Sequence, residues 1–281
     1  MEAPRMGQGV DLDGRVVSII TPGWGGEVKQ ILEKSNSEFA FVGWNQVGAG
    51  RTRNRRRLME MVMTTIWLAR HAESAAPTVF HGAESNIGLS ELGHRQAEAA
   101  AAWFQPLVPT VVVSSGMIRA KETAAPIAAA CGVAHHIETE LYERRVGELG
   151  GTSFSSKSGP WHDTIHRWMA GDTAYTTPGA ESFDELRNRL VPALERVARQ
   201  FAGQRAVVVA HGVVCKVLLL ALLADRGPAG WQTLGRVANL AVSKLQFDGT
   251  VWTAERLLEV PPSVAALTAA NEARTGEKSQ G

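Results

Sequence analysis

The fold of this chain is indicated by one stretch of sequence, Thr65-Ile66-Trp67-Leu68-Ala69-Arg70-His71-Ala72-Glu73-Ser74. Its first half is a continuous apolar run, which is typical of a strand that is covered on both faces of a parallel sheet. Charged and polar side chains follow at once. Because ligands bind at the carboxyl ends of the strands in open α/β sheets, the stretch predicts a central strand that ends in a polar site.

Two later segments repeat this arrangement. Val111–Val113 is a second apolar run and leads to Arg119 at the start of a helix, and Ala206–Ala210 is a third run that leads directly to His211. If the three strands are neighbours, two arginines and two histidines meet at one edge of the sheet. Arginine forks match phosphate oxygens and a helix amino terminus attracts anions, so this edge predicts a cationic pocket.

Helical patterns separate these strands. They cover Glu91–Gln105, Ala120–Cys131, Ser182–Ala202 and Gly212–Leu223, and two closing strands are expected at Val237–Phe247 and Val251–Leu258. Strands that alternate with helices predict an α/β fold, with a mostly parallel central sheet flanked by helices on both faces.

The composition is that of an ordinary globular protein. The chain has 281 residues, 44% of them hydrophobic, and 29 Lys and Arg against 28 Asp and Glu give a formal net charge of +1. This near-neutral balance argues against a protein that coats nucleic acid with its whole surface. No run approaches the roughly 20 apolar residues that span a membrane, so we expect no membrane partner. The two cysteines, Cys131 and Cys215, lie far apart, and we expect a reducing, cytoplasmic location.

Both ends of the chain differ from its middle. For residues 1–60 we expect a disordered extension, or one that precedes the native start, or a small ordered appendage. The extension contains the arginine run Arg51–Arg57. If the chain contacts nucleic acid at all, this run is the candidate segment, but we expect no nucleic-acid partner. We expect one domain over residues 61–261 and a mobile polar tail over residues 262–281.

Six elements of the sequence together resemble the histidine phosphatase superfamily, the phosphoglycerate mutase-like group. In order along the chain they are Arg70–Ser74, Leu89–Ala97, Ser114–Ala124, Leu141–Gly147, Gly179–Ser182 and Ala210–Gly212. They occur in the order of the family and span roughly residues 64–258, which argues against a chance match. The resemblance implies a phosphoglycerate mutase-like fold.

The resemblance also implies residue roles. His71, Glu143 and His211 would be catalytic, with His71 as the nucleophile that takes the phosphoryl group and Glu143 as the acid that protonates the leaving oxygen. Arg70, Arg119 and His211 would bind the phosphate oxygens. We expect no cofactor and no metal ion, because the arginines supply the positive charge that phosphoryl transfer needs.

Elementary chemistry agrees with these roles. A neutral imidazole can attack phosphorus, and the neighbouring cations disfavour its protonation. The second ring nitrogen of His71 must then be held by an acceptor, for which we expect a backbone carbonyl.

The sequence departs from the family pattern at three places. Ala72 replaces a glycine, and Pro77 replaces an asparagine that often contacts the phosphate, for which Asn86 is a candidate substitute. Mutases of the group carry a tyrosine where this chain has Val146. The missing tyrosine favours a phosphatase over a mutase.

The segment between Glu143 and Glu181 is a candidate for substrate selection. Arg144, Arg145 and Glu181 are candidate substrate contacts, as is Asn86. His162 and His166 are four residues apart and would suit a two-histidine metal face, but no third ligand is evident. We therefore prefer an amphipathic helix that covers the pocket.

The expected function is a metal-independent phosphomonoester hydrolase that works through a phosphohistidine on small phosphorylated metabolites. One alternative is a phosphoglycerate-type mutase, which returns the phosphoryl group to another position of the substrate. A second alternative is a module that binds phosphate or phosphoproteins without catalysis, for which Ala72 and Pro77 are the support. The oligomeric state is left open.

Overall fold

The computed structural model describes the strands of the first unit, by their backbone, and then residues 63–152 and 159–275. The chain divides into two compact units, Met1–Arg57 and Leu58–Gly281. The first unit contains the short strands β1 (Arg5–Val10), β2 (Val16–Thr21), β3 (Lys29–Gln30), β4 (Leu32–Lys34) and β5 (Glu38–Ala40). They pair antiparallel, β1 with β2, β2 with β3, and β4 with β5.

For residues 1–60 the sequence left three alternatives: a disordered extension, one that precedes the native start, or a small ordered appendage. The short strands β2 and β5 fall within these residues, and the three alternatives given for residues 1–60 stay predictions. The expectation of a later native start stays a prediction. The arginine run at 51–57, Met59 and Met61 lie outside the described residues.

The second unit is built on a six-stranded sheet in the order β11-β10-β6-β9-β7-β8. The strands are β6 (Thr64–Arg70), β7 (Val111–Ser114), β8 (His135–Ile137), β9 (Arg205–Ala210), β10 (Val242–Phe247) and β11 (Trp252–Glu259). β6, β9, β7 and β8 run parallel, whereas β10 pairs antiparallel with both β6 and β11. The predicted fold class, a mostly parallel central sheet, is confirmed.

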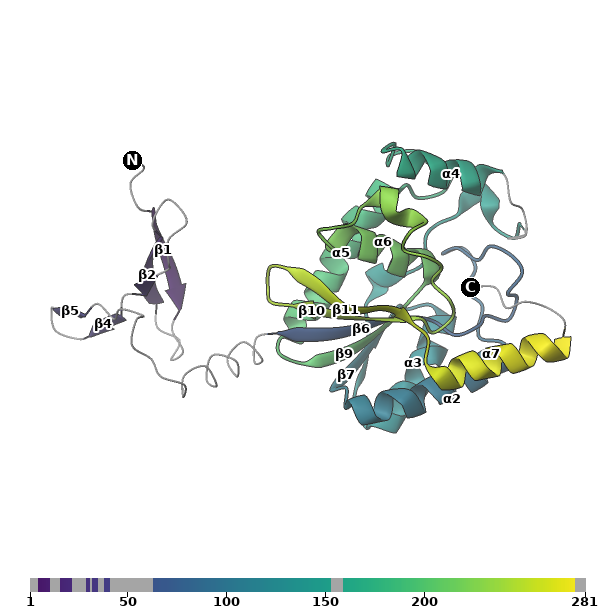
Figure 1. Cartoon of the computed structure of the whole chain (residues 1–281), viewed down its shortest axis with the longest axis horizontal. Helices are drawn as coiled ribbons and strands as arrows, with labels where there is room; N and C mark the ends of the chain where they lie inside the picture. The colour runs from purple at the N-terminus through teal and green to yellow at the C-terminus, as the bar shows by residue number, and fades with distance from the viewer. Residues whose placement is uncertain are drawn as a thin grey trace. The chain divides into compact units, whose positions relative to one another are not determined.

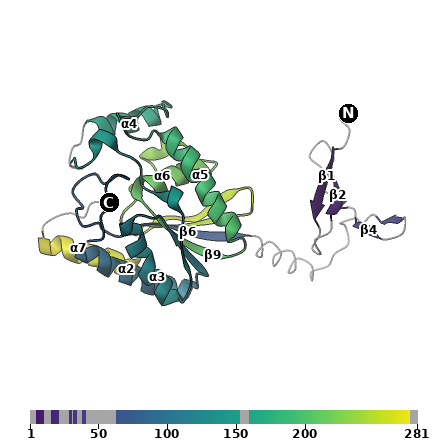
Figure 2. The same ribbon diagram turned by 180° about the vertical axis from the view of Figure 1, so that it is seen from behind.

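Helices cover both faces of this sheet. The longer ones are α2 (Glu91–Phe104), α3 (Ile118–Cys131), α4 (Pro160–Met169), α5 (Phe183–Gln200), α6 (Gly212–Leu222) and α7 (Pro262–Thr275). Short 3-10 helices lie at η1 (Gln105–Leu107), η2 (Thr139–Leu141), η3 (Gly147–Leu149) and η4 (Pro228–Trp231). α5 and α6 lie on one side of the sheet, and α2 and α3 lie on the other, as both views show (Figures 1 and 2).

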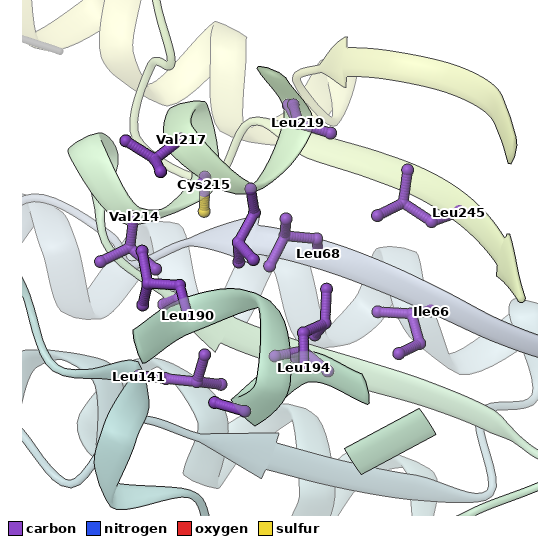
Figure 3. Close-up of a cluster of buried hydrophobic side chains, with 14 of the residues drawn as sticks. Ile66, Leu68, Leu141, Leu190, Leu194, Val214, Cys215, Val217, Leu219 and Leu245 are labelled. Atoms are coloured by element: carbon purple, nitrogen blue, oxygen red, sulfur yellow. The ribbon is translucent and has the colours of Figure 1, made fainter. Parts of the chain in front are cut away.

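The alternation of side chains along each strand explains the two layers. Ile66 and Leu68 face α5 and α6, whereas Trp67 and Ala69 face α2 and α3. Figure 3 shows Ile66 and Leu68 in one cluster with Leu190 and Leu194, which come from α5. Because successive residues of a strand point to opposite faces, a strand that is covered on both sides must be apolar throughout.

The chain after β11 differs from the expectation of a mobile tail. Residues Pro262–Thr275 form α7, which packs along α2. Val264 is fully buried, and the Gln96 side chain donates a hydrogen bond to the Thr268 hydroxyl at 3.0 Å. The helix presents few apolar residues to its neighbour, which is why its composition resembles that of a solvated tail. Residues 276–281 lie outside the described part of the chain.

From the sequence we expected no membrane partner, because no apolar run is long enough to span a bilayer. In the part of the chain that the structure describes, no helix combines the length and the apolar character that crossing a bilayer requires.

Candidate active site

The central strands deliver charged residues to one edge of the sheet. Arg70, the last residue of β6, lies opposite Ala210, the last residue of β9, in the parallel register. His71 and His211 therefore leave adjacent strands at the same level, and their ring centroids are 5.2 Å apart. Arg119 arrives from the first turn of α3, which follows β7. The fold thus brings both histidines and both arginines together, because parallel strands end at a common edge.

The surroundings of His71 define its tautomer. The ring is buried, and its Nδ1 lies 2.6 Å from the Ala72 carbonyl oxygen, which can only accept. Arg119 Nε donates to His71 Nε2 at 3.3 Å. The proton is therefore assigned to Nδ1, and Nε2 keeps its lone pair.

Burial and charge keep this imidazole neutral. Burial lowers the pKa of His71 well below its usual value of 6.5, and the positive charges of Arg119 and Arg70 lower it further. At neutral pH His71 is consequently an unprotonated nitrogen nucleophile.

The two arginines are held by backbone oxygens rather than by carboxylates. Arg70 Nη1 donates to the Val237 carbonyl at 2.8 Å, and Arg119 Nη1 donates to the Ser85 carbonyl at 2.7 Å. Burial lowers the pKa of Arg70 to about 10, so it is still charged at neutral pH. Arg70 Nε is buried with no hydrogen-bond partner among the described residues. Gly212, the first residue of α6, lies against this side chain, because a Cβ there would be 3.4 Å from the same nitrogen.

His211 lies behind His71. Its Nε2 is 2.9 Å from the Ser115 hydroxyl, and its buried Nδ1 has no hydrogen-bond partner within the described chain. Burial lowers the pKa of His211 well below its usual value, and Arg119 and His71 add to the effect. An unpartnered buried nitrogen beside the nucleophile is able to donate to an anion.

Glu143 is held over the same edge by two backbone amides. The Arg144 N–H donates to one carboxylate oxygen at 2.8 Å, and the Val213 N–H donates to the other at 3.4 Å. The side chain is buried yet lines the cavity that His71 opens onto.

That cavity has a volume of about 300 Å³. Of the predicted residues, Arg70, His71, Arg119 and Glu143 line it, together with Pro77, which stands where an asparagine was expected. The other lining residues are Glu73, Ser74, Val79, His81, Arg236 and Asn239.

His81, Arg236 and Asn239 were not found by the sequence analysis. The Asn239 amide donates to the His71 carbonyl oxygen at 3.2 Å. His81 also disfavours a second positive charge nearby and so adds slightly to the lowering of the pKa of His71. Arg236 and Asn239 precede β10, which runs antiparallel beside β6. A signal was available, because the residues before such a strand must lie at the carboxyl end of its neighbour.

Asn86 does not lie in the catalytic cavity, where a substitute for the missing phosphate-contacting asparagine was expected. Its side chain is exposed and lines neither this cavity nor its neighbour. Its Oδ1 accepts a hydrogen bond from the Ile118 N–H at 2.8 Å, so it caps the first turn of α3. Asn86 therefore acts on the orientation of α3.

Arg144 and Glu181 are also placed differently from the expectation of substrate contact. Arg144 is fully buried, with its guanidinium 4.9 Å from the ring centre of Trp161, and its Nε donates to the Glu181 carbonyl at 2.7 Å. The Glu181 carboxylate accepts from Arg189 Nε and Nη2 at 3.0 and 2.9 Å. Arg145 is half exposed and pairs with Glu181 at 3.5 Å. These three residues tie α4 and α5 to the loop that carries Glu143.

The segment that was expected to cover the pocket forms helix α4. Trp168 of this helix is fully buried, in keeping with an amphipathic helix. His162 and His166 lie on it, and across residues 63–152 and 159–275 no group of three potential metal-ligating side chains occurs. The two-histidine metal face thus has no third ligand in the described chain.

Comparisons with known proteins identify the family. The profile of the histidine phosphatase superfamily (branch 1) matches residues 66–259. A metal-independent phosphoserine phosphatase of Arabidopsis thaliana is 32% identical over 69% of this chain and 81% of its own length. A probable phosphoglycerate mutase of Yersinia pestis is 29% identical over 68% of this chain and 89% of its own length. For some mycobacterial relatives, the match spans about half of the relative, 51%.

The solved structures agree on the fold. A mycobacterial glucosyl-3-phosphoglycerate phosphatase superposes with a TM-score of 0.60 at 24% identity, over 70% of this chain and 99% of that one. The chain belongs to the histidine phosphatase superfamily, branch 1. The predicted class, a phosphatase of the histidine phosphatase type with a phosphoglycerate mutase-like fold, is thereby confirmed.

Proposed function

We propose that this chain hydrolyses small phosphomonoesters in two steps, with His71 as the nucleophile. The observation that carries the proposal is the tautomer of His71. Its Nε2 lone pair accepts a hydrogen bond from Arg119 Nε, and its Nδ1 proton is assigned to the hydrogen bond with the Ala72 carbonyl. The ring lines a cavity together with Arg70, Arg119 and Glu143. A neutral nitrogen nucleophile among fixed cations is what in-line attack on a phosphate dianion requires.

In the first step, His71 Nε2 attacks phosphorus and the bond from phosphorus to the alcohol oxygen breaks. The acid form of Glu143 donates its proton to that oxygen, so the alcohol leaves neutral. Arg70 and Arg119, which line the cavity, stabilise the charge on the equatorial oxygens. We assign to His211 a hydrogen bond to the same group, because its buried Nδ1 has no partner among the described residues. The ring phosphorylated at Nε2 keeps its Nδ1 proton and carries a positive charge, which the hydrogen bond from Nδ1 to the Ala72 carbonyl stabilises.

In the second step, the Glu143 carboxylate takes a proton from water while the water oxygen attacks phosphorus. The bond from phosphorus to Nε2 breaks, inorganic phosphate leaves, and His71 returns to its neutral form. No metal ion is assigned a step, because the arginines carry the charge. We propose a cytoplasmic location on the ground that both cysteines, Cys131 and Cys215, are free.

The test is release of phosphate from para-nitrophenyl phosphate with a chelator present. We expect turnover by the wild type, none by His71→Ala, and a reduction of about 10²–10⁴-fold in Glu143→Gln. The exposed His94 provides the matched control, so His94→Ala should match the wild type. Equal turnover by the wild type and His71→Ala would contradict the proposal, and tight phosphate binding without turnover would favour a binding module.

The substrate screen begins with phosphoserine, the substrate named for the Arabidopsis relative. The similarity to a probable phosphoglycerate mutase makes 3-phosphoglycerate the second compound. Isomerisation of 3-phosphoglycerate faster than its hydrolysis would favour the mutase alternative.

A further inference from the structure

A second cavity, of about 480 Å³, adjoins the catalytic one. Arg70, Glu143 and Arg236 line both cavities, so the two are neighbours that share a wall. The second cavity lies between α4, α6 and the segment that contains η4. Of its lining residues, the proposed mechanism uses Arg70 and Glu143, and the others have no role in it.

One wall of this second cavity is aromatic. Trp161 of α4 and Trp231 of η4 line it, with ring centroids 6.0 Å apart. Both rings pack edge-on against Trp168, at 5.9 and 5.4 Å, and the Arg144 guanidinium lies against Trp161. The wall is therefore supported from behind by buried side chains, which suits it to contact the carbon skeleton of a ligand.

A lysine of α6 lies against this aromatic wall. Lys216 of α6 lines the second cavity, and its Nζ lies 4.8 Å from the ring centre of Trp231 and donates to the Gly235 carbonyl at 2.7 Å. An ammonium has three donors, so Lys216 has N–H groups left for a ligand. Partial burial lowers the pKa of Lys216 to about 8, so the side chain is mostly charged at neutral pH.

The charge of the second cavity favours an anion. Among its described lining residues Glu143 is the one carboxylate, and it stands against Lys216, Arg70 and Arg236. Glu143 is already engaged by two backbone amides. The other residues of the lining with a full charge, Lys216, Arg70 and Arg236, are cationic.

The position of Glu143 indicates in which direction the alcohol part of a bound substrate extends. His71 and Arg119 line the catalytic cavity but not the second one, whereas Glu143 lines both. Because the acid must reach the oxygen of the departing alcohol, that oxygen lies at the shared wall. The rest of the alcohol then extends into the second cavity, away from the nucleophile.

We infer that Lys216 is a specificity-determining residue, and that the preferred substrates are phosphomonoesters whose alcohol carries a second anionic group. The second anion, a carboxylate or another phosphate, pairs with the Lys216 ammonium while Trp161 and Trp231 contact the carbon skeleton. This inference rests on the proposed function, because the direction of the substrate follows from the role of Glu143.

The experiment compares matched substrates in the full chain and in Lys216→Met, which keeps the length of the side chain and removes its charge. The pairs are 3-phosphoglycerate against glycerol 3-phosphate, and phosphoserine against phosphoethanolamine. Each pair differs by one carboxylate, and 2,3-bisphosphoglycerate adds a compound whose second anion is a phosphate as well. Lys121→Met serves as the control, because Lys121 is exposed and lines neither cavity.

We expect the wild type to prefer the carboxylate-bearing member of at least one pair, in kcat/KM. In Lys216→Met that preference should fall about tenfold to a hundredfold, mainly through KM, since a hydrogen bond to a charged group is worth about 1.5–3 kcal/mol. Lys121→Met should keep the preference. A loss confined to 2,3-bisphosphoglycerate would identify the second anion as a phosphate and still support the inference.

Two results would overturn the inference. One is a wild type that turns over both members of every pair equally, together with a Lys216→Met variant that keeps the wild-type turnover of 2,3-bisphosphoglycerate. The other is a Lys216→Met variant that loses both members of each pair to the same extent, which indicates a structural role. Binding of 3-phosphoglycerate by calorimetry, compared between His71→Ala and His71→Ala with Lys216→Met, decides the point without turnover. Equal affinities there refute the role of Lys216, whereas failure of the proposed function appears separately, as hydrolysis that does not depend on His71.

Discussion

At the scale of single residues, the site depends on histidines that are kept neutral by burial among arginines. His71 and His211 are both buried, and the pKa of each is held well below the ordinary value of 6.5. This neutrality benefits catalysis, because a protonated ring has no lone pair to attack phosphorus. It also links the free energy of unfolding to pH.

The sign of that link follows from proton uptake. Below about pH 6.5 the unfolded chain protonates these histidines and the folded chain does not, so stability that is present above this pH is lost as the pH falls. Each histidine contributes a slope of up to about 1.4 kcal/mol per pH unit. We expect the free energy of unfolding by urea, measured from pH 7.5 to pH 5, to fall less steeply in His71→Gln than in the wild type.

The exposed His94 supplies the control for this measurement, and His94→Gln should keep the wild-type slope. Identical slopes in His71→Gln and the wild type would show that His71 titrates normally in the folded protein.

Glu181 stabilises the fold through a buried ion pair. Its side chain is 2% exposed and pairs with Arg189, which is 9% exposed. We expect Glu181→Gln to lower the free energy of unfolding by about 3–5 kcal/mol, because a buried guanidinium loses its counter-ion. Glu195→Gln, which breaks the exposed pair with Arg199, should cost no more than about 1 kcal/mol. A rise in KM for Glu181→Gln with unchanged stability would restore Glu181 as a substrate contact.

At the scale of secondary-structure elements, α7 is a helix with few buried apolar residues that packs along α2. Val264 is its fully buried residue, and it belongs to the cluster between α2, α3 and the sheet. Val264→Ala removes two methyl groups from this contact, and we expect a loss of about 2 kcal/mol in the free energy of unfolding.

Val251 allows a matched comparison, because its side chain is 55% exposed. Val251→Ala should change the stability by no more than about 0.5 kcal/mol. If Val264→Ala were equally neutral in urea titrations, residues 262–275 would behave as the mobile tail that the sequence suggested.

At the scale of the whole molecule, the described residues that line both cavities come from the second unit. The catalytic cavity is lined between Arg70 and Asn239, and the chain divides at Arg57 and Leu58. We expect removal of residues 1–57 to leave kcat/KM for para-nitrophenyl phosphate unchanged, because the core and the site are built without them. A large loss of turnover in the truncated chain would show that the first unit contributes to the site. Salt-sensitive binding of DNA by the full chain alone would support a role for the arginine run at 51–57.

The class of fold and the residues at the centre of the proposed site could be predicted from the sequence alone. Apolar runs such as Ile66–Ala69 and Val207–Ala210 report burial on both faces of a sheet, and their carboxyl ends carry His71 and His211. These features are local, since a strand and the residue that follows it are neighbours in the chain. Local patterns therefore predicted which residues meet at the edge of the sheet.

The surroundings of that centre could not be predicted and depend on how distant segments pack together. Arg144 and Glu181 were predicted to contact substrate, yet they are buried against partners such as Trp161 and Arg189. Arg236 and the cavity lined by Lys216 arise where α6 and the segment before β10 come together. The physical reason is that the burial and pairing of a charged side chain depend on elements distant in sequence, which the pattern of hydrophobic residues does not encode.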